Sequence, residues 1–146
     1  MRAALAVAQQ TSASGDVPVG ALIVNSAGEI IATGHNEREL HNDPTAHAEI
    51  VAIRRACEKT GQWRLENHII VVTLEPCPMC AGAIAQSRIS TVVFGAWDEK
   101  AGAVGSVWDL IRDPRALNKV EVRGGVLADE CSVLLKEFIQ GVRKKD

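Results

Sequence analysis

Aromatic side chains are scarce in this chain of 146 residues: tyrosine is absent, and there are only 2 phenylalanines and 3 tryptophans. Hydrophobic residues still make up 47% of the sequence, so aliphatic side chains must fill the core. A single domain over residues 1–146 is long enough to bury about two thirds of its unfolded surface. No repeat or low-complexity segment interrupts it, so we expect one domain.

The chain also has no excess of basic residues: 16 lysines and arginines stand against 18 aspartates and glutamates. The formal net charge is -2, which excludes a global positive field that would attract nucleic acid or an anionic membrane. Any contact with nucleic acid must therefore depend on a local patch.

Long apolar segments are absent as well. The first ten residues contain an apolar run that is too short for a signal peptide, and no stretch approaches the length of a membrane span. We therefore expect a cytoplasmic protein with no membrane partner. In that reducing compartment, the 4 cysteines are expected to bind metal or to be buried rather than to form disulfides.

Hydrophobic periodicity predicts strands that alternate with helices. The expected strands are residues 19–24 and 30–33, joined by a hairpin turn over 25–28, and then 69–74, 91–94 and 120–122. The expected helices are residues 2–13, a segment announced by Asp43-Pro44 and ended by Gly61, residues 79–87, and a last helix with an apolar stripe between Cys131 and Val142. Residues 95–105 are expected to be irregular. This order indicates a layered α/β domain with helices on both faces of the sheet.

In the second of these helices, Ala46, Ile50, Ile53 and Cys57 recur at helical spacing and are expected to form its apolar face. Cys57 and Cys131 are both interpreted as small buried hydrophobic residues.

Two short motifs carry the chemistry. They are His47-Ala48-Glu49 and, about thirty residues later, Pro76-Cys77-Pro78-Met79-Cys80. One histidine and two cysteines give three ligands, one fewer than the four that close a structural zinc site. The fourth position is then open to water, and Glu49 is placed to handle the protons of that water. The pair of motifs predicts a hydrolytic zinc centre in which His47, Cys77 and Cys80 bind the metal.

Each motif alone has another interpretation. A lone C-x-x-C also occurs as a redox pair, and a lone histidine is most often a core or surface residue. His35, His41 and His68 lack ligand spacing and are not predicted to bind zinc. The combination of H-x-E with P-C-x-x-C is far more specific, because it is the signature of zinc nucleobase deaminases.

Longer segments resemble the bacterial tRNA-specific adenosine deaminase family (TadA), within the cytidine deaminase-like superfamily. The similar segments are Asp16-Val17-Pro18-Val19-Gly20-Ala21, Gly34-His35-Asn36, Asp43-Pro44-Thr45-Ala46-His47-Ala48-Glu49-Ile50, Thr73-Leu74-Glu75 with the cysteine motif through Ala83, and residues 94–106 and 125–131.

This resemblance implies a three-layer α/β/α fold with a mixed five-stranded sheet. It implies hydrolytic deamination of the wobble adenosine (position 34) of a tRNA anticodon to inosine, with one Zn²⁺ per subunit and Glu49 as the proton shuttle. The anticodon stem-loop would be the substrate partner, and the enzyme would be a homodimer.

The resemblance also implies substrate contacts. Asn36 matches a position that contacts the flipped base, and Val17, Pro18 and Ala48 match the surrounding pocket. Asp98 and Lys100 match a loop beside the anticodon nucleotides. Trp97, where many relatives carry a basic residue, either stacks on a base or covers a dimer contact.

Three further features leave alternatives open. Leu117-Asn118 replaces an Asn-His pair of the family, so no RNA contact is transferred there. The basic tail Arg143-Lys144-Lys145 either meets phosphates or is a solvated helix end. The small residues that follow Met79, mostly alanine and glycine, permit a close contact either with a partner subunit or within the chain.

Two other functions compete with tRNA editing. A deaminase of a free base or nucleoside, such as guanine or cytosine, would use the same zinc chemistry, and the acidic net charge suits it. A noncatalytic RNA-binding subunit with a structural zinc would not need Glu49, so Glu49→Ala would leave its function unchanged.

Overall fold

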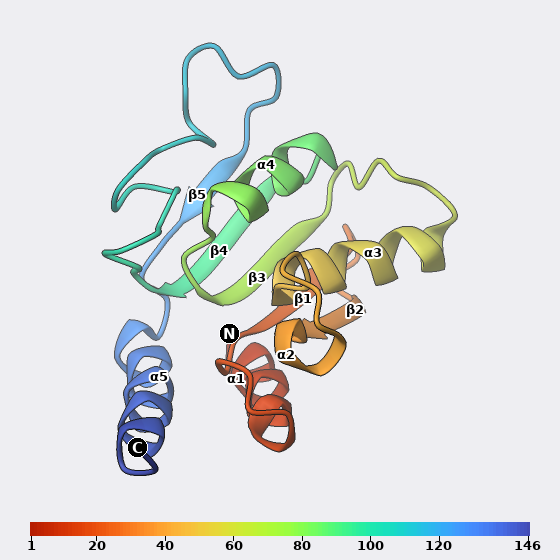
Figure 1. The fold of residues 1–146 in the computed structure, drawn as a ribbon. Helices are drawn as coiled ribbons and strands as arrows, with labels where there is room; N and C mark the ends of the chain where they lie inside the picture. The colour runs from red at the N-terminus through yellow and green to blue at the C-terminus, as the bar shows by residue number, and fades with distance from the viewer.

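The computed structural model describes all residues from 1 to 146 (Figure 1). The elements in chain order are α1 (Arg2–Ala8), the 3₁₀ helix η1 (Gln9–Ala13), β1 (Gly20–Val24), β2 (Ile30–His35), α2 (Arg38–His41), α3 (Ala48–Thr60), β3 (Ile69–Leu74), α4 (Pro78–Gln86), β4 (Thr91–Ala96), β5 (Glu121–Arg123) and α5 (Ala128–Arg143). No helix is both long enough and apolar enough to cross a membrane.

The five strands form one mixed sheet in the order β2-β1-β3-β4-β5. β1 is antiparallel to β2 and β3, whereas β3, β4 and β5 run parallel. The predicted hairpin joins β1 and β2, and its turn is closed by Asn25, whose Oδ1 accepts the amides of Ala27 and Glu29. The strand over residues 69–74 has the predicted bounds and lies at the centre of the sheet.

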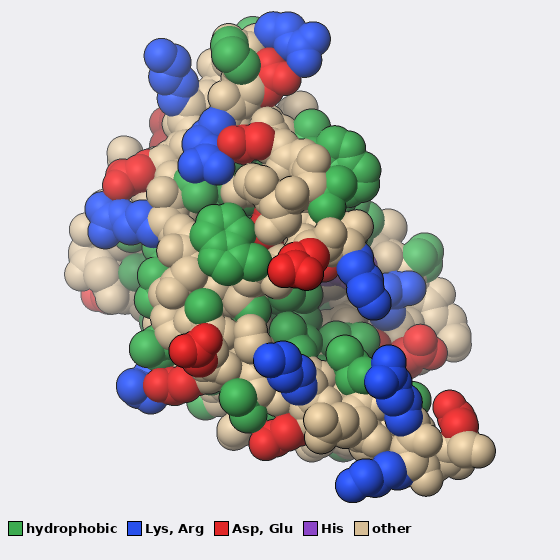
Figure 2. All heavy atoms as spheres, turned by 90° about the vertical axis from the view of Figure 1, so that its left-hand side faces the viewer, with side chains coloured by type: hydrophobic (Ala, Val, Ile, Leu, Met, Phe, Trp, Pro, Cys, Tyr) green, Lys and Arg blue, Asp and Glu red, His purple; other side chains and the backbone are tan.

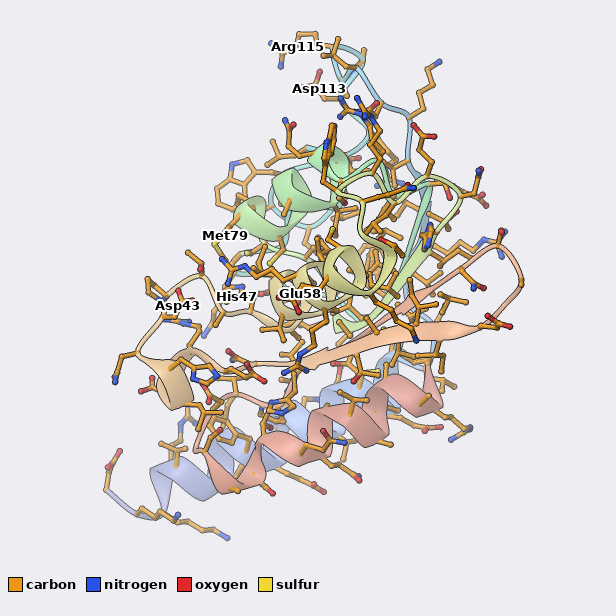
Figure 3. All side chains as sticks on the ribbon, turned by 90° about the vertical axis from the view of Figure 1, so that its right-hand side faces the viewer. Asp43, His47, Glu58, Met79, Asp113 and Arg115 are labelled. Atoms are coloured by element: carbon orange, nitrogen blue, oxygen red, sulfur yellow. The ribbon has the colours of Figure 1, made fainter.

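Helices cover both faces of the sheet, which confirms the predicted three-layer α/β/α fold. α3 and α4 lie on one face, and α1 and α5 lie on the other (Figures 1 and 3). Glycines let the helices approach closely: a Cβ on Gly34 would lie 2.5 Å from the carbonyl oxygen of Ala48, and one on Gly95 would lie 2.3 Å from Cys131 Sγ. The core is aliphatic, as expected, and Phe94 is its largest fully buried side chain.

The N-terminal helix is shorter than predicted. The α-helix ends at Ala8, and the rest of the expected range is the 3₁₀ helix η1. Thr11, which is fully buried, donates through its hydroxyl to the Ala8 carbonyl oxygen at 2.7 Å. Side-chain competition of this kind for backbone acceptors is why threonine disfavours a continuing α-helix.

The prediction for the second major helix was wrong at its start and only partly right about its buried face. α3 begins at Ala48, not at Asp43-Pro44, because Asp43 forms a turn in which its Oδ1 accepts both the amide and the hydroxyl of Thr45. The side chains of α3 that are buried are those of Ala48, Glu49, Val51, Ala52 and Ala56. Of the predicted residues, Ile53 and Cys57 are partly buried and pack against the core, and Ile50 is partly buried as well.

Several smaller differences separate the structure from the sequence-based prediction. The short helix α2 was not predicted, and β5 lies one residue later than expected. In α5 the predicted apolar stripe is only partly covered: Cys131 is buried, but Ile139 and Val142 are exposed. β2 and β4 each extend two residues further than predicted, so Gly95 and Ala96, expected to be irregular, form the end of β4. Residues 97–119 contain no helix or strand.

Candidate metal centre and the cleft around it

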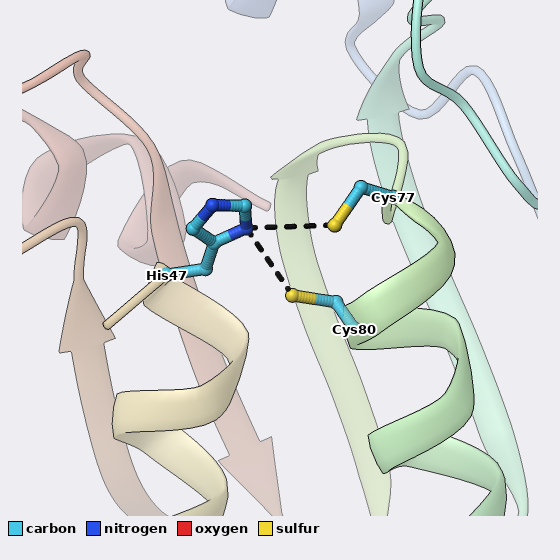
Figure 4. A group of neighbouring side chains, drawn as sticks. All are labelled: His47, Cys77 and Cys80. Atoms are coloured by element: carbon cyan, nitrogen blue, oxygen red, sulfur yellow. Dashed lines mark hydrogen bonds between the residues drawn. The ribbon is translucent and has the colours of Figure 1, made fainter. Parts of the chain in front are cut away.

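Two helix N-termini bring the predicted metal ligands together. His47 is the N-cap of α3, and Cys77 is the N-cap of α4, with Cys80 one turn further along that helix. α3 and α4 pack side by side on the same face of the sheet. The imidazole of His47 therefore points at both sulfur atoms across the gap between the two helices (Figure 4).

The distances match a tetrahedral zinc ion. His47 Nδ1 lies 3.5 Å from Cys77 Sγ and 3.5 Å from Cys80 Sγ. Zinc bonds near ~2.3 Å to sulfur and ~2.0 Å to nitrogen place such ligands roughly 3.5 Å apart. All three ligand atoms lie within 4.8 Å of one another. The donor set of one imidazole and two thiols therefore fits one Zn²⁺, with three protein ligands as in catalytic rather than structural sites.

The electrostatics of the site favour thiolate formation. The pKa of Cys77 is lowered to about 4, because the Cys80 thiol and the His47 imidazole both hydrogen-bond its sulfur. The same contact with Cys77 raises the pKa of His47 and, together with burial, the pKa of Cys80. Amides at the start of α4 add to the stabilisation of the thiolate. These contacts favour a thiolate at Cys77, which is the form of cysteine that binds a cation.

Glu49 lies in the first turn of α3, directly after His47 and Ala48. Its side chain is 4% exposed. Burial raises the pKa of its carboxyl group. A carboxylate that holds a proton more readily than usual suits a group that takes and returns protons.

A cleft of about 230 Å³ opens above these groups. Its lining residues are Val17, Val19, Asn36, Arg38, His47, Ala48, Glu49, Leu74, Glu75, Cys77, Asp98 and Ala101. One wall comes from the segment before β1 and from the end of β2, and the other from the segments that follow β3 and β4. The cleft therefore brings together residues that are far apart in the sequence.

Most of the predicted site residues line this cleft. Val17, Asn36, Ala48 and Asp98 do so together with the metal ligands and Glu49. Pro18 does not: it borders a separate hollow between η1 and α5. Lys100 is exposed on the loop after β4 and is not part of the lining.

Asn36 is held in place by its own chain. Its Nδ2 donates to the carbonyl oxygen of Val17 at 3.2 Å, and its Oδ1 accepts the amide of Arg38 at 3.2 Å. Next to it, the buried carboxylate of Asp16 accepts the amides of Glu39 and Leu40 in α2. These contacts fix one wall of the cleft.

Sequence reasoning missed two charged residues in the lining, Arg38 and Glu75. Arg38 follows Asn36 by two residues, and Glu75 separates the apolar strand β3 from the cysteine motif. Glu75 could have been recognised, because a carboxylate directly after an apolar strand is unusual. Nothing local distinguishes Arg38 from the other arginines of the chain.

Comparisons with known proteins agree with this geometry. Residues 1–96 match the family model described as the cytidine and deoxycytidylate deaminase zinc-binding region. The tRNA-specific adenosine deaminase of Bacillus subtilis (strain 168) is 46% identical over 145 residues, covering 99% of this chain and 89% of that protein. The enzyme of the same name from Haemophilus influenzae is 48% identical, covering 99% of this chain and 84% of that protein.

A solved structure gives the same result. The structure, from a study of A-to-I editing by tRNA:A34 deaminases at the wobble position, superposes with a TM-score of 0.87 at 41% identity and covers 92% of this chain and 96% of that one. The chain therefore belongs to the tRNA-specific adenosine deaminase family of zinc-dependent hydrolases.

Proposed function

We propose that this enzyme deaminates the wobble adenosine (position 34) of a tRNA anticodon to inosine, releasing ammonia. The observation that carries the proposal is the three-ligand centre of His47, Cys77 and Cys80, with buried Glu49 beside it, at the base of an open cleft. The tRNA-specific relatives, which match over nearly their whole length, support the choice of substrate.

The chemistry requires one water molecule per adenosine. When bound, zinc supplies a Lewis acid that makes hydroxide available near neutral pH. Glu49 takes a proton from the water and passes it to a ring nitrogen of adenine as the oxygen adds at C6. Glu49 then takes the proton of the new hydroxyl group on C6 and delivers it to the amino group as the C6–N bond breaks. The overall change is adenosine and water to inosine and ammonia, so atoms and charge balance.

The cleft supplies recognition of the flipped base. Asn36 would hydrogen-bond the base, while Val17 and Ala48 would pack against its ring. The Asn36 amide is pre-oriented by its bonds to Val17 and Arg38. Pro18 borders the separate hollow beside η1 and α5, so we assign it no contact with the base.

Contacts with the flanking nucleotides would come from the loop after β4. Asp98 lines the cleft, and exposed Lys100 extends from the same loop. Acidic and basic side chains are interspersed on the face over α5 and this loop, and no continuous basic surface is seen there (Figure 2). RNA binding would therefore depend on a few local contacts near the cleft, in the cytoplasm where tRNA is found.

We also propose that the enzyme is a homodimer that uses the outer side of α4. Ala81 and Ile84 pack inside the chain, but Met79 is 36% exposed, and a Cβ added to Gly82 would meet nothing within 4 Å. Met79 stands at the outer edge of α4 close to His47 (Figure 3). A Met79→Asp variant should shift the molar mass measured by light scattering from dimer to monomer, and a wild-type monomer would refute the proposal.

A deamination assay tests the function. A synthetic anticodon stem-loop with a wobble adenosine is incubated with wild type or Glu49→Ala, beside free adenosine, guanine and cytosine. Inosine formed only in the stem-loop, and only by wild type, is the expected result. Turnover of a free base alone would keep the zinc chemistry and overturn the substrate, and an active Glu49→Ala would overturn the role of Glu49. The free-base alternative is less supported, because the tRNA-specific relatives share 46–48% of their residues with this chain, whereas the guanine deaminase structures share 26–34%.

A further inference from the structure

The buried carboxylate of Glu75 is surrounded by donors from a single loop. Glu75 is 2% exposed and stands between β3 and the cysteine motif. Its Oε1 accepts the amide of Asp98 at 3.0 Å and the hydroxyl of Ser106. Its Oε2 accepts the amides of Val104 at 3.1 Å and Ser106 at 3.0 Å. Both oxygens are thus fully used within residues 98–106.

The loop is closely fitted around this carboxylate. A Cβ on Gly102 would lie 2.4 Å from Glu75 Oε2, so only glycine fits there. The amide of Ala103 donates to the Pro76 carbonyl oxygen at 2.8 Å, which ties the loop to the residue next to Glu75. Apart from the isolated bridge between Val104 and Asp109, the segment has no strand or helix pairing of its own. The loop also makes backbone bonds of its own, such as the one from the Gly102 amide to the Asp98 carbonyl oxygen at 2.9 Å, and the contacts with Glu75 and Pro76 anchor it to the end of β3.

The same loop forms a wall of the cleft. Asp98 and Ala101 line the cleft opposite Val17 and Asn36. Asp98 is itself ordered by this arrangement, because its Oδ1 accepts the amides of Lys100 at 3.0 Å and Ala101 at 3.1 Å. One carboxylate thus determines where several cleft residues stand.

We propose that Glu75 is a positioning residue that holds loop 98–106 in the shape that receives the nucleotides beside the wobble adenosine, an inference that rests on the proposed function. Glu75 does not touch the reacting atoms, because the loop occupies both of its oxygens. A preformed loop avoids the entropy cost of ordering it when RNA binds. Loss of Glu75 should therefore weaken RNA binding while leaving the hydrolytic step largely intact.

A glutamine at this position provides a sharp test. Glu75→Gln keeps the size of the side chain but removes the charge, and it turns one acceptor into an NH₂ group that faces N–H donors. Ser106→Ala removes one hydroxyl donor and leaves the other bonds, so it provides a milder variant. Glu58→Gln is the matched control, because Glu58 is exposed on α3 and makes no hydrogen bond with its side chain; Figure 3 shows its position.

The readouts are KM and kcat on the stem-loop, amide hydrogen exchange over residues 98–106, and zinc content. For Glu75→Gln we expect KM to rise roughly tenfold or more and kcat to change by less than about threefold. The amides of Asp98, Val104 and Ser106 should exchange faster than in wild type. The zinc content should stay at one ion per chain. Ser106→Ala should change KM and exchange in the same direction but less, and Glu58→Gln should match wild type.

Other outcomes separate the two proposals. Unchanged KM and unchanged exchange in Glu75→Gln, with an active wild type, would overturn the role of Glu75 alone. A loss of zinc, or a fall in kcat with unchanged KM, would also overturn it, because Glu75 would then support the metal centre. A wild type that never edits the stem-loop would refute the proposed function, whatever the exchange rates. If Glu75→Gln fails to fold, Ser106→Ala decides by the same two readouts.

Discussion

Asn36 donates a hydrogen bond through its Nδ2 to the carbonyl oxygen of Val17, at 3.2 Å. Both residues line the cleft, and the bond joins the end of β2 to the segment before β1. The Oδ1 of the same side chain accepts the amide of Arg38. An amide is required here, because one side must donate and the other must accept.

Asn36→Asp should therefore lower activity, although asparagine and aspartate have nearly the same size. Aspartate can still accept the Arg38 amide, but it cannot donate to Val17, and its charge would face a carbonyl oxygen. The Val17 carbonyl oxygen would lose its donor in a partly buried site, and such a loss costs about 1 kcal/mol or more, so we expect kcat/KM on the stem-loop to fall by about tenfold. Steady-state kinetics measures the change, and Asn42→Asp, at an exposed turn, serves as the control. Equal activity of Asn36→Asp and wild type would contradict the role of the amide.

Glu49→Gln should remove nearly all deamination without removing the metal. General acid–base groups contribute about 10²–10⁴-fold to rate, and glutamine cannot shuttle protons. The midpoint temperature of thermal unfolding should be no lower than that of wild type, because the change removes a buried carboxyl group that can carry a charge. Single-turnover assays, metal analysis and a melting curve check the three expectations. Residual activity within tenfold of wild type would show that another group moves the protons.

Cys80→Ser should lose zinc, activity and stability together. Cys80 is fully buried and is one of the three ligand groups, so binding of the ion is coupled to folding around it. A chelator should have the same effect on wild type, and added zinc should reverse it. Cys57→Ser is the matched control, because Cys57 is only partly buried and lies outside the ligand group. Metal analysis that finds one zinc per chain in Cys80→Ser would exclude Cys80 as a ligand.

Asp16 should make the stability of the protein depend on pH in the acid range. Burial raises its pKa, but the amide of Glu39, the hydroxyl of Ser14 and the amide of Leu40 outweigh burial, and the pKa of Asp16 is lowered overall. The stabilisation is then complete above the ordinary pKa of aspartate and disappears as pH falls through the lowered value.

We therefore expect Asp16→Asn to reduce the free energy of unfolding by about 1 kcal/mol at pH 7. The difference from wild type should shrink below about pH 4. Urea denaturation at a series of pH values measures the difference, with Glu58→Gln as the control. A difference that stays constant from pH 7 to pH 3 would show that the charge of Asp16 is not involved.

Gly34→Ala should destabilise the protein by separating α3 from β2. The new Cβ would lie 2.5 Å from the Ala48 carbonyl oxygen and 2.6 Å from the Ala52 amide nitrogen. Overpacking against backbone costs ~1–3 kcal/mol. Because Ala48 begins the helix that carries Glu49, activity should fall as well. Gly141→Ala is the control, since a Cβ there meets nothing within 4 Å, and alanine should stabilise α5 by about 0.5–1 kcal/mol. A chemical denaturation series compares the two.

Some features of this protein followed from the sequence because they depend on neighbouring residues. The apolar run at Ile69–Leu74 has the bounds of β3, since a β-branched segment closed by Glu75-Pro76 has few other conformations. The C-x-x-C spacing places Cys77 and Cys80 one helical turn apart, and H-x-E keeps Glu49 beside His47. Such local spacing predicts the three metal ligands, which the structure brings together, and the proposed proton carrier Glu49.

Tertiary structure decided what local spacing could not. α3 begins at Ala48 rather than at Asp43-Pro44, and small residues such as Ala48 and Ala52 are its most deeply buried ones, because β2 approaches the helix closely at Gly34. Arg38 and Glu75 line the cleft, whereas Pro18 and Lys100 do not. Which residues line a cleft depends on which segments, distant in the sequence, meet there. The sequence by itself determined which residues form the metal centre. The packing of helices and loops on the sheet determined which residues form the walls of the cleft, because those contacts join residues that lie far apart in the sequence and follow no periodic spacing.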